Sequence, residues 1–130
     1  MVLSKDEVNF YNDQGYLLVE DVISKDQHNE MLALVKDFFE KSKIVNVNDN
    51  IFDLEDGHSS TNPRLKRVKQ PHQHSQFFWD IIKQSKIEGI LVDLLGKDVS
   101  LKTSKLNTKA PGGGAAVEWH QDWAFYPHTN

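Results

Sequence analysis

A histidine and an aspartate stand two positions apart near the end of the sequence, at His120 and Asp122. They lie in segment 117–125, which is rich in aromatic and other strand-forming residues, and side chains on a strand alternate between its two faces. In a strand, both side chains would therefore point the same way and could bind one metal ion. One imidazole and one carboxylate are two of the three protein ligands of the 2-His-1-carboxylate site for non-haem Fe(II). The pair is the candidate metal site.

The spacing alone is a weak signal, because 6 histidines and 12 aspartates in 130 positions give roughly half an H-x-D pair by chance. His28 and Glu30 show the same spacing, but their segment has helical periodicity, and residues i and i+2 of a helix do not share a face. His28 and Glu30 are therefore excluded as joint ligands of one metal ion. His58 is interpreted as a solvated loop residue, and His72 and His74 as parts of a surface loop rather than metal ligands.

Composition limits the remaining classes. The chain has 130 residues, enough for one domain, with 38% hydrophobic and 26% charged residues. A net charge of −4 gives no basic field for nucleic acid, and no cysteine is present for thiolate chemistry. No apolar run approaches the roughly 20 residues of a membrane span. We expect one soluble, cytoplasmic domain that binds neither nucleic acid nor membrane.

Hydrophobic periodicity predicts helices first and sheet last, an α+β arrangement. Capping boxes at Ser4, Ser24 and Ser85, each with Glu or Gln three residues on, predict helix starts. The predicted helices span 5–13, 25–41, 76–83 and 85–96. The predicted strands span 16–22, 99–109 and 117–125, with one short strand in the polar loop 43–60. The basic segment 64–69 is either a solvated strand edge or an anion contact.

The sequence resembles the phytanoyl-CoA dioxygenase (PhyH) family. The resemblance is carried by the segments Gly15–Val19, Leu106–Gly113 and Trp119–Pro127, the last reading W-H-Q-D-W-A-F-Y-P. It implies helices packed on a double-stranded β-helix (jelly-roll). It also implies an Fe(II)- and 2-oxoglutarate-dependent dioxygenase that hydroxylates a small molecule while 2-oxoglutarate is converted to succinate.

The resemblance implies roles for single residues. His120 and Asp122 would be the first two iron ligands, and Gln121 would lie near the cosubstrate. Cosubstrate contacts would come from one face of the preceding strand and from a basic residue further upstream. These residues are Lys105, Asn107, Lys109 and Arg67. The family's second histidine and its 2-oxoglutarate-binding arginine follow the H-x-D motif at a distance, so we expect the 130 residues to be the N-terminal part of a longer protein, inactive alone.

Two other hypotheses stay open. One is a non-catalytic binding module, in which a truncated jelly-roll pairs its open edge with another chain. The other is a cupin-like metal protein that uses His120 with different partners. For a metal site, histidine and carboxylate ligands without cysteine favour iron or manganese over structural zinc.

Overall fold

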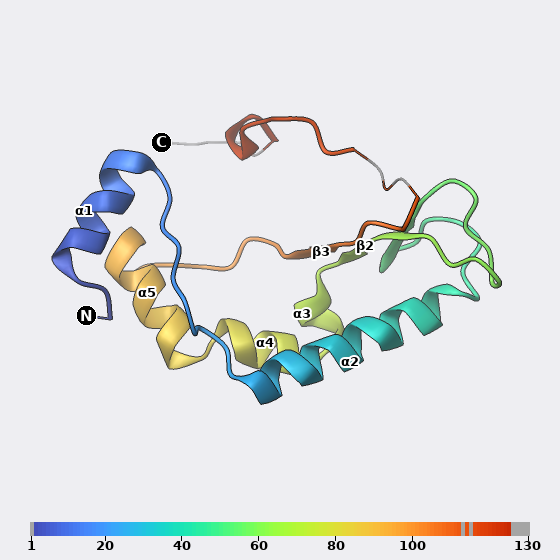
Figure 1. Ribbon diagram of the computed structural model, residues 1–130, viewed down its shortest axis with the longest axis horizontal. Helices are drawn as coiled ribbons and strands as arrows, with labels where there is room; N and C mark the ends of the chain where they lie inside the picture. Colours follow the sequence, from blue (N-terminus) through green and yellow to red (C-terminus); the bar gives the residue numbers. More distant parts are fainter. Residues whose placement is uncertain (1, 113, 115, 126–130) are drawn as a thin grey trace.

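The computed structural model describes residues 2–112, 114 and 116–125 and combines helices with a small sheet (Figure 1). In chain order the elements are α1 (Lys5–Gln14), α2 (Lys25–Ser42), β1 (Phe52–Leu54), β2 (Leu65–Lys69), α3 (Pro71–His74), α4 (Gln76–Ile82), α5 (Ser85–Leu95), β3 (Lys105–Asn107) and the 3₁₀ helix η1 (Asp122–Phe125). The mixed helix-and-strand class is confirmed. The jelly-roll stays a prediction, since the described sheet has three strands.

Local sequence signals set where the first two helices begin. The Ser4 hydroxyl accepts the Glu7 N–H at 3.3 Å, and the Glu7 carboxylate accepts the Ser4 N–H at 2.7 Å. Ser24 and Gln27 repeat this arrangement at the start of α2, with distances of 3.1 and 2.8 Å. Both predicted capping boxes are therefore confirmed. Each satisfies backbone donors that a helix leaves without an internal partner.

The third predicted capping box is wrong. Gln84 is the N-cap of α5, and Ser85 is already its first helical residue. The Gln84 side chain explains this placement, because its amide donates to the Val22 carbonyl and its carbonyl accepts from Gln27, each at 3.1 Å. These contacts hold Gln84 extended, with φ −65° and ψ 144°, outside the helix.

The sheet places its apolar residues against the helices. The strand order is β1-β2-β3, and both pairings are antiparallel. Phe52, Val68 and Leu106 are opposite one another across the three strands and pack in the core. The ring of Phe38 in α2 lies 6.3 Å from that of Phe52 and 6.3 Å from that of Phe78 in α4. These buried contacts join the sheet to α2 and α4.

Segment 64–69 is not a strand edge. Residues Leu65–Lys69 form β2, the central strand, which pairs with β1 on one side and β3 on the other. Alternation explains how a basic segment can occupy the centre: Val68 is 0% exposed in the core, whereas Arg67 and Lys69 lie on the opposite face. Arg67 and Lys69 therefore lie together on the face away from α2.

Three strand predictions fail wholly or in part. Residues 16–22 have no strand pairing, and Leu18 is 80% exposed. Only Lys105–Asn107 of the segment 99–109 pairs. Residues 116–121 carry no regular structure and lead into η1. A strand needs a hydrogen-bonded neighbour. The described sheet provides none beside 16–22 and 116–121, and β2 pairs with 99–109 only around Lys105–Asn107. Tyr126 and Pro127, which end the expected motif, lie outside the described residues.

The N-terminal residues are held against α5. The Asp93 carboxylate accepts the N–H groups of Val2 at 2.5 Å and Leu3 at 2.9 Å. These bonds, Leu3 first, hold the pKa of the Asp93 carboxyl below its usual range. Gly89 lets the chain approach, because a Cβ there would overlap the Val2 side chain. Leu3 is buried at 5% exposure, so this clamp joins α1 to α5.

His58 fixes the loop between β1 and β2, so the expectation of a solvated residue is wrong. Its Nδ1 accepts the Arg64 N–H at 2.9 Å, which requires Nε2 to carry the proton that it donates to the Ser42 carbonyl at 3.0 Å. An ion pair of 3.0 Å between Arg64 and Glu55 closes the same loop. The imidazole therefore connects the end of α2 to the residue just before β2.

His72 is also more constrained than a surface loop residue. It lies in α3, its Nδ1 is 2.6 Å from the Ser104 hydroxyl, and its ring stacks on Trp79 at 5.6 Å between centroids.

Within the described residues, no helix is long and apolar enough to cross a bilayer.

Asp93→Asn should lower the melting temperature at neutral pH, because an amide oxygen accepts N–H bonds more weakly than a carboxylate. The folded-state pKa of Asp93 is lowered, so its stabilisation is present above the unfolded-state pKa of about 3.9 and is lost as pH falls through the folded value. In calorimetry from pH 7 to 2, the gap between wild type and variant should narrow below about pH 4. A gap of the same size at every pH would contradict the clamp; Asp98→Asn, at an exposed carboxylate, is the control.

His58→Ala should reduce the free energy of unfolding by about 1–3 kcal/mol, because it removes two hydrogen bonds and leaves a backbone N–H and a carbonyl without their partner. Urea denaturation measures the change. His28→Ala, at an exposed helix position, is the matched control and should stay within about 0.5 kcal/mol of wild type. Equal effects of the two substitutions would show that the His58 bonds add nothing to stability.

Candidate functional site

The predicted metal-binding pair lies at the start of η1 rather than in a strand. The His120 Nε2 and the Asp122 Oδ1 are 3.2 Å apart, although the strand geometry that motivated the pairing is absent. The 3₁₀ turn beginning at Asp122 brings the carboxylate back toward the imidazole. The His120 side chain is 39% exposed and the Asp122 side chain 67%. Both groups are open to solvent and to a ligand.

The protonation of His120 follows from its second contact. Its Nδ1 lies 2.6 Å from the Glu118 carbonyl, which can only accept, so Nδ1 carries the proton. In the neutral ring, Nε2 then presents a lone pair toward the Asp122 carboxylate. Two lone-pair atoms 3.2 Å apart repel unless a proton or a cation lies between them. A metal-ligating histidine commonly donates its other N–H to a backbone carbonyl in this way. The donor set therefore fits a divalent cation.

The Phe125 ring meets the His120 ring edge-on, with 5.3 Å between centroids. Gln121 is exposed, and its carbonyl accepts the Ala124 N–H at 3.2 Å within the same turn. Trp119 is fully exposed at 103%, so it is neither core nor pocket wall among the described residues. The turn is thus organised by its own residues. Within the described part of the chain, no group of three His, Asp or Glu side chains is arranged to hold a metal.

The predicted cosubstrate residues lie on the sheet. Arg67 on β2 is opposite Asn107 on β3, and the Arg67 Nε donates to the Asn107 Oδ1 at 3.1 Å. Lys105 is exposed on the same face, opposite Lys69. The alternating exposure of 105, 107 and 109 agrees with the expectation that these three share a face. The structure therefore brings Arg67 and Asn107 into contact.

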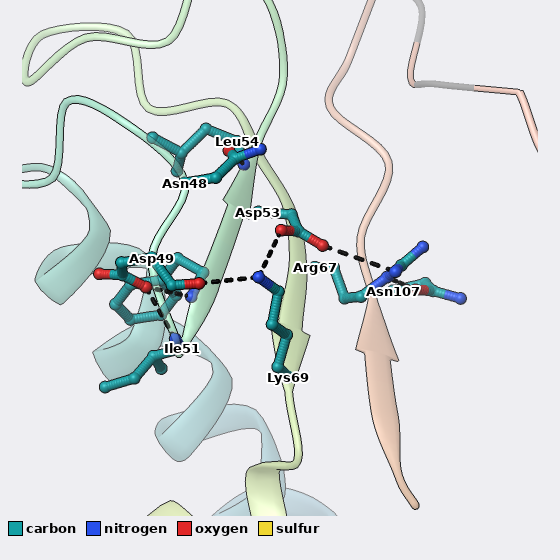
Figure 2. Close-up of polar contacts among 9 residues, drawn as sticks. Asn48, Asp49, Ile51, Asp53, Leu54, Arg67, Lys69 and Asn107 are labelled. Carbon is teal, nitrogen blue, oxygen red and sulfur yellow. Dashed lines mark hydrogen bonds and ion pairs between the residues drawn. The ribbon is translucent and has the colours of Figure 1, made fainter.

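Sequence reasoning missed the polar network around these residues (Figure 2). The Asp53 carboxylate lies 3.5 Å from the Arg67 Nη1 and 2.8 Å from the Lys69 Nζ. The Lys69 ammonium also donates to the Asp49 carbonyl at 2.7 Å. The usable signal was alternation in β1, where an acidic residue stands between apolar Phe52 and Leu54. Its place opposite Arg67 depends on strand register, which the sequence did not reveal.

Segment 116–125 and the sheet form two separate groups of predicted site residues. Figure 1 shows the segment on the side of β2 and β3 that faces away from α2. A cavity of about 690 Å³ lies elsewhere, between α4, α5 and residues 97–102, and its lining includes Trp79, Leu91 and Leu101. None of the predicted site residues lines that cavity. The candidate chemistry is therefore assigned to the polar sheet face and the His120 turn rather than to the cavity.

The His120–Asp122 pair offers two of the three protein ligands of a non-haem Fe(II) site. Sequence comparison gives the family. The chain belongs to the phytanoyl-CoA dioxygenase (PhyH) family, whose model matches residues 11–130. The resemblance found from the motifs is thus confirmed, and it extends over almost the whole chain.

Curated proteins similar to this chain are named as dioxygenases. A probable alpha-ketoglutarate-dependent hypophosphite dioxygenase of Stutzerimonas stutzeri is 38% identical over 121 residues, which are 92% of this chain and 42% of that protein. Ectoine dioxygenases of Nocardia farcinica and Bordetella bronchiseptica are 22% and 25% identical, over 91% and 93% of this chain and 38% and 37% of their own lengths. The chain spans about two fifths of the length of these curated relatives.

Mn(II) added to the chain should broaden the NMR signals of His120 and its neighbours, because the paramagnetic ion would bind between Nε2 and the Asp122 carboxylate. His28 provides an internal control, since it is also two positions from a carboxylate but lies on helix α2. Asp122→Ala should remove the selective broadening. Equal broadening at His28, or broadening that survives the substitution, would contradict the metal site.

Proposed function

We propose that this chain supplies part of the active site of an Fe(II)- and 2-oxoglutarate-dependent dioxygenase that hydroxylates a small molecule. The reaction joins 2-oxoglutarate, O₂ and a C–H or equivalent bond to give succinate, CO₂ and the hydroxylated product. The observation that carries the proposal is the PhyH family match, which includes the H-x-D pair at His120 and Asp122. Relatives named for hypophosphite and for ectoine support a small-molecule substrate.

His120 and Asp122 are assigned to hold the iron. The Glu118 carbonyl keeps the Nδ1 proton of His120 in place, so the ring presents Nε2 to the metal. The Asp122 carboxylate adds a negative charge that compensates part of the metal's charge. Bound iron would supply the redox chemistry that brings the 2-oxo acid and O₂ to reaction. The third protein ligand is assigned to the second histidine that family members carry after the H-x-D motif.

Arg67 and Asn107 are assigned to the cosubstrate. 2-Oxoglutarate carries two carboxylates, and a guanidinium is the side chain best suited to bind one of them with directed N–H groups. Asn107 accepts from the Arg67 Nε at 3.1 Å and so orients the guanidinium on the open face of the sheet. Lys105, on that face, and Lys109 add positive charge that favours a dianion. Gln121 stays assigned to the cosubstrate side of the metal pair.

A fusion protein tests the proposal. Residues 1–130 would replace the matching 42% of the Stutzerimonas stutzeri relative, leaving the rest of that protein unchanged. The fusion should release succinate from 2-oxoglutarate in the presence of Fe(II) and O₂, with hypophosphite as the first substrate to assay. Asp122→Ala in the fusion should lower succinate release at least ~100-fold, because a metal ligand is lost.

Asp56→Asn is the matched control, since it removes an exposed carboxylate from the β1–β2 loop and should leave the rate unchanged. Circular dichroism establishes that the fusion is folded. A folded fusion that loads iron and releases no succinate would contradict the oxygenase assignment, and it would favour the non-catalytic binding module. Turnover that depends on metal but not on 2-oxoglutarate would favour the cupin-like alternative.

A further inference from the structure

One polar residue from each strand forms a row across the sheet. Asp53 on β1 is opposite Arg67 on β2, and Arg67 is opposite Asn107 on β3. Figure 2 shows the three side chains on the same side of the sheet. Because alternation sends Phe52 and Val68 to the core, this row lies on the face turned away from α2. The order is carboxylate, guanidinium and amide.

The guanidinium of Arg67 is held from both sides. Its Nη1 lies 3.5 Å from the Asp53 Oδ2, and its Nε donates to the Asn107 Oδ1 at 3.1 Å. Within the described residues, no acceptor takes its Nη2. The Arg67 side chain is 33% exposed, so its remaining N–H groups can reach a ligand. Asp53 and Asn107 thus fix the plane of the guanidinium, while its Nη2 stays available to a ligand.

Asp53 is itself anchored. Its second oxygen is 2.8 Å from the Lys69 Nζ, and Lys69 also donates to the Asp49 carbonyl at 2.7 Å. The Asp49 side chain accepts the N–H groups of Ile51 and Phe52 at 2.7 and 2.6 Å, which ties the loop to the start of β1. The Asp53 side chain is only 18% exposed. A carboxylate with both oxygens engaged and little solvent is a rigid support for Arg67.

We propose that Asp53 is a positioning residue, whose carboxylate holds the Arg67 guanidinium against Asn107 so that Arg67 can bind a carboxylate of 2-oxoglutarate. The identity of this anion rests on the proposed function; the row across the sheet does not. Asp53 does not touch the cosubstrate and acts through Arg67. The negative charge of Asp53 matters because a neutral amide would hold the guanidinium more weakly.

Two physical effects of Asp53 on an anion have opposite signs. A fixed negative charge beside the site repels a dianion, so its removal alone would tighten binding. Correct orientation of Arg67 strengthens binding, so loss of the support would weaken it. The Asp53→Asn variant keeps the shape of the side chain and removes its charge. The direction of its effect therefore decides between repulsion and positioning.

The first experiment is a double-mutant cycle with 2-oxoglutarate as the probe, titrated into the chain and followed by ¹H–¹⁵N NMR. Asp53→Asn should raise the Kd about 10-fold. In an Arg67→Ala background the same substitution should no longer weaken binding, because the positioning effect of Asp53 acts only through Arg67. Asp56→Asn, which removes an exposed carboxylate from the neighbouring loop, should change the Kd less than about twofold.

A second measurement reports the positioning without any ligand. The Arg67 Nε–H should exchange slowly with solvent in the wild type, because it is bonded to Asn107, and faster in Asp53→Asn. Tighter binding in Asp53→Asn, additive effects in the cycle, unchanged exchange at Arg67, or no binding by the unsubstituted chain would each overturn the proposal. Failure of the oxygenase assignment would give a different result. The fusion would release no succinate, while the double-mutant cycle and the Arg67 exchange rates would still come out as expected.

Discussion

The antiparallel register of β2 with its two neighbours is the constraint on which the other features depend. It places Phe52, Val68 and Leu106 together against the helices. The same register places Asp53, Arg67 and Asn107 together on the other face. A shift by one residue would reverse both faces, burying an arginine and exposing a valine that is 0% exposed in this structure. The apolar core therefore determines the position of the polar row.

Contacts between distant parts of the chain hold this sheet and its helices in place. Asp93 joins the N-terminal residues to α5, and His58 joins the end of α2 to the loop before β2. Each uses a single side chain to make hydrogen bonds to two backbone groups. The His120 turn is different, because its described contacts come from Glu118, Asp122 and Phe125 close by in sequence. Its geometry is set locally.

The features that were predictable are those encoded within a few residues. The Ser4 and Ser24 capping boxes gave correct helix starts. His120 and Asp122 lie 3.2 Å apart, but at a 3₁₀ turn rather than in the predicted strand, and their role as metal ligands stays a prediction. Strands were predicted poorly, because a strand-prone segment such as 16–22 becomes a strand only where a neighbour pairs with it. The contact of Asp53 with Arg67 was not predictable, because it depends on the register between β1 and β2. No local sequence signal encodes that register.

A shared site requires that one 2-oxoglutarate molecule contacts both the His120 turn and the Arg67 face of the sheet. The most direct measurement is a titration of 2-oxoglutarate into the chain with and without Mn(II), following the Arg67 side-chain Nε–H signal and the His120 ring signals together. We expect both sets of signals to respond at the same 2-oxoglutarate concentration, and at a lower concentration when the metal is present. A response of Arg67 that is independent of the metal, or a response at His120 alone, would contradict a shared site.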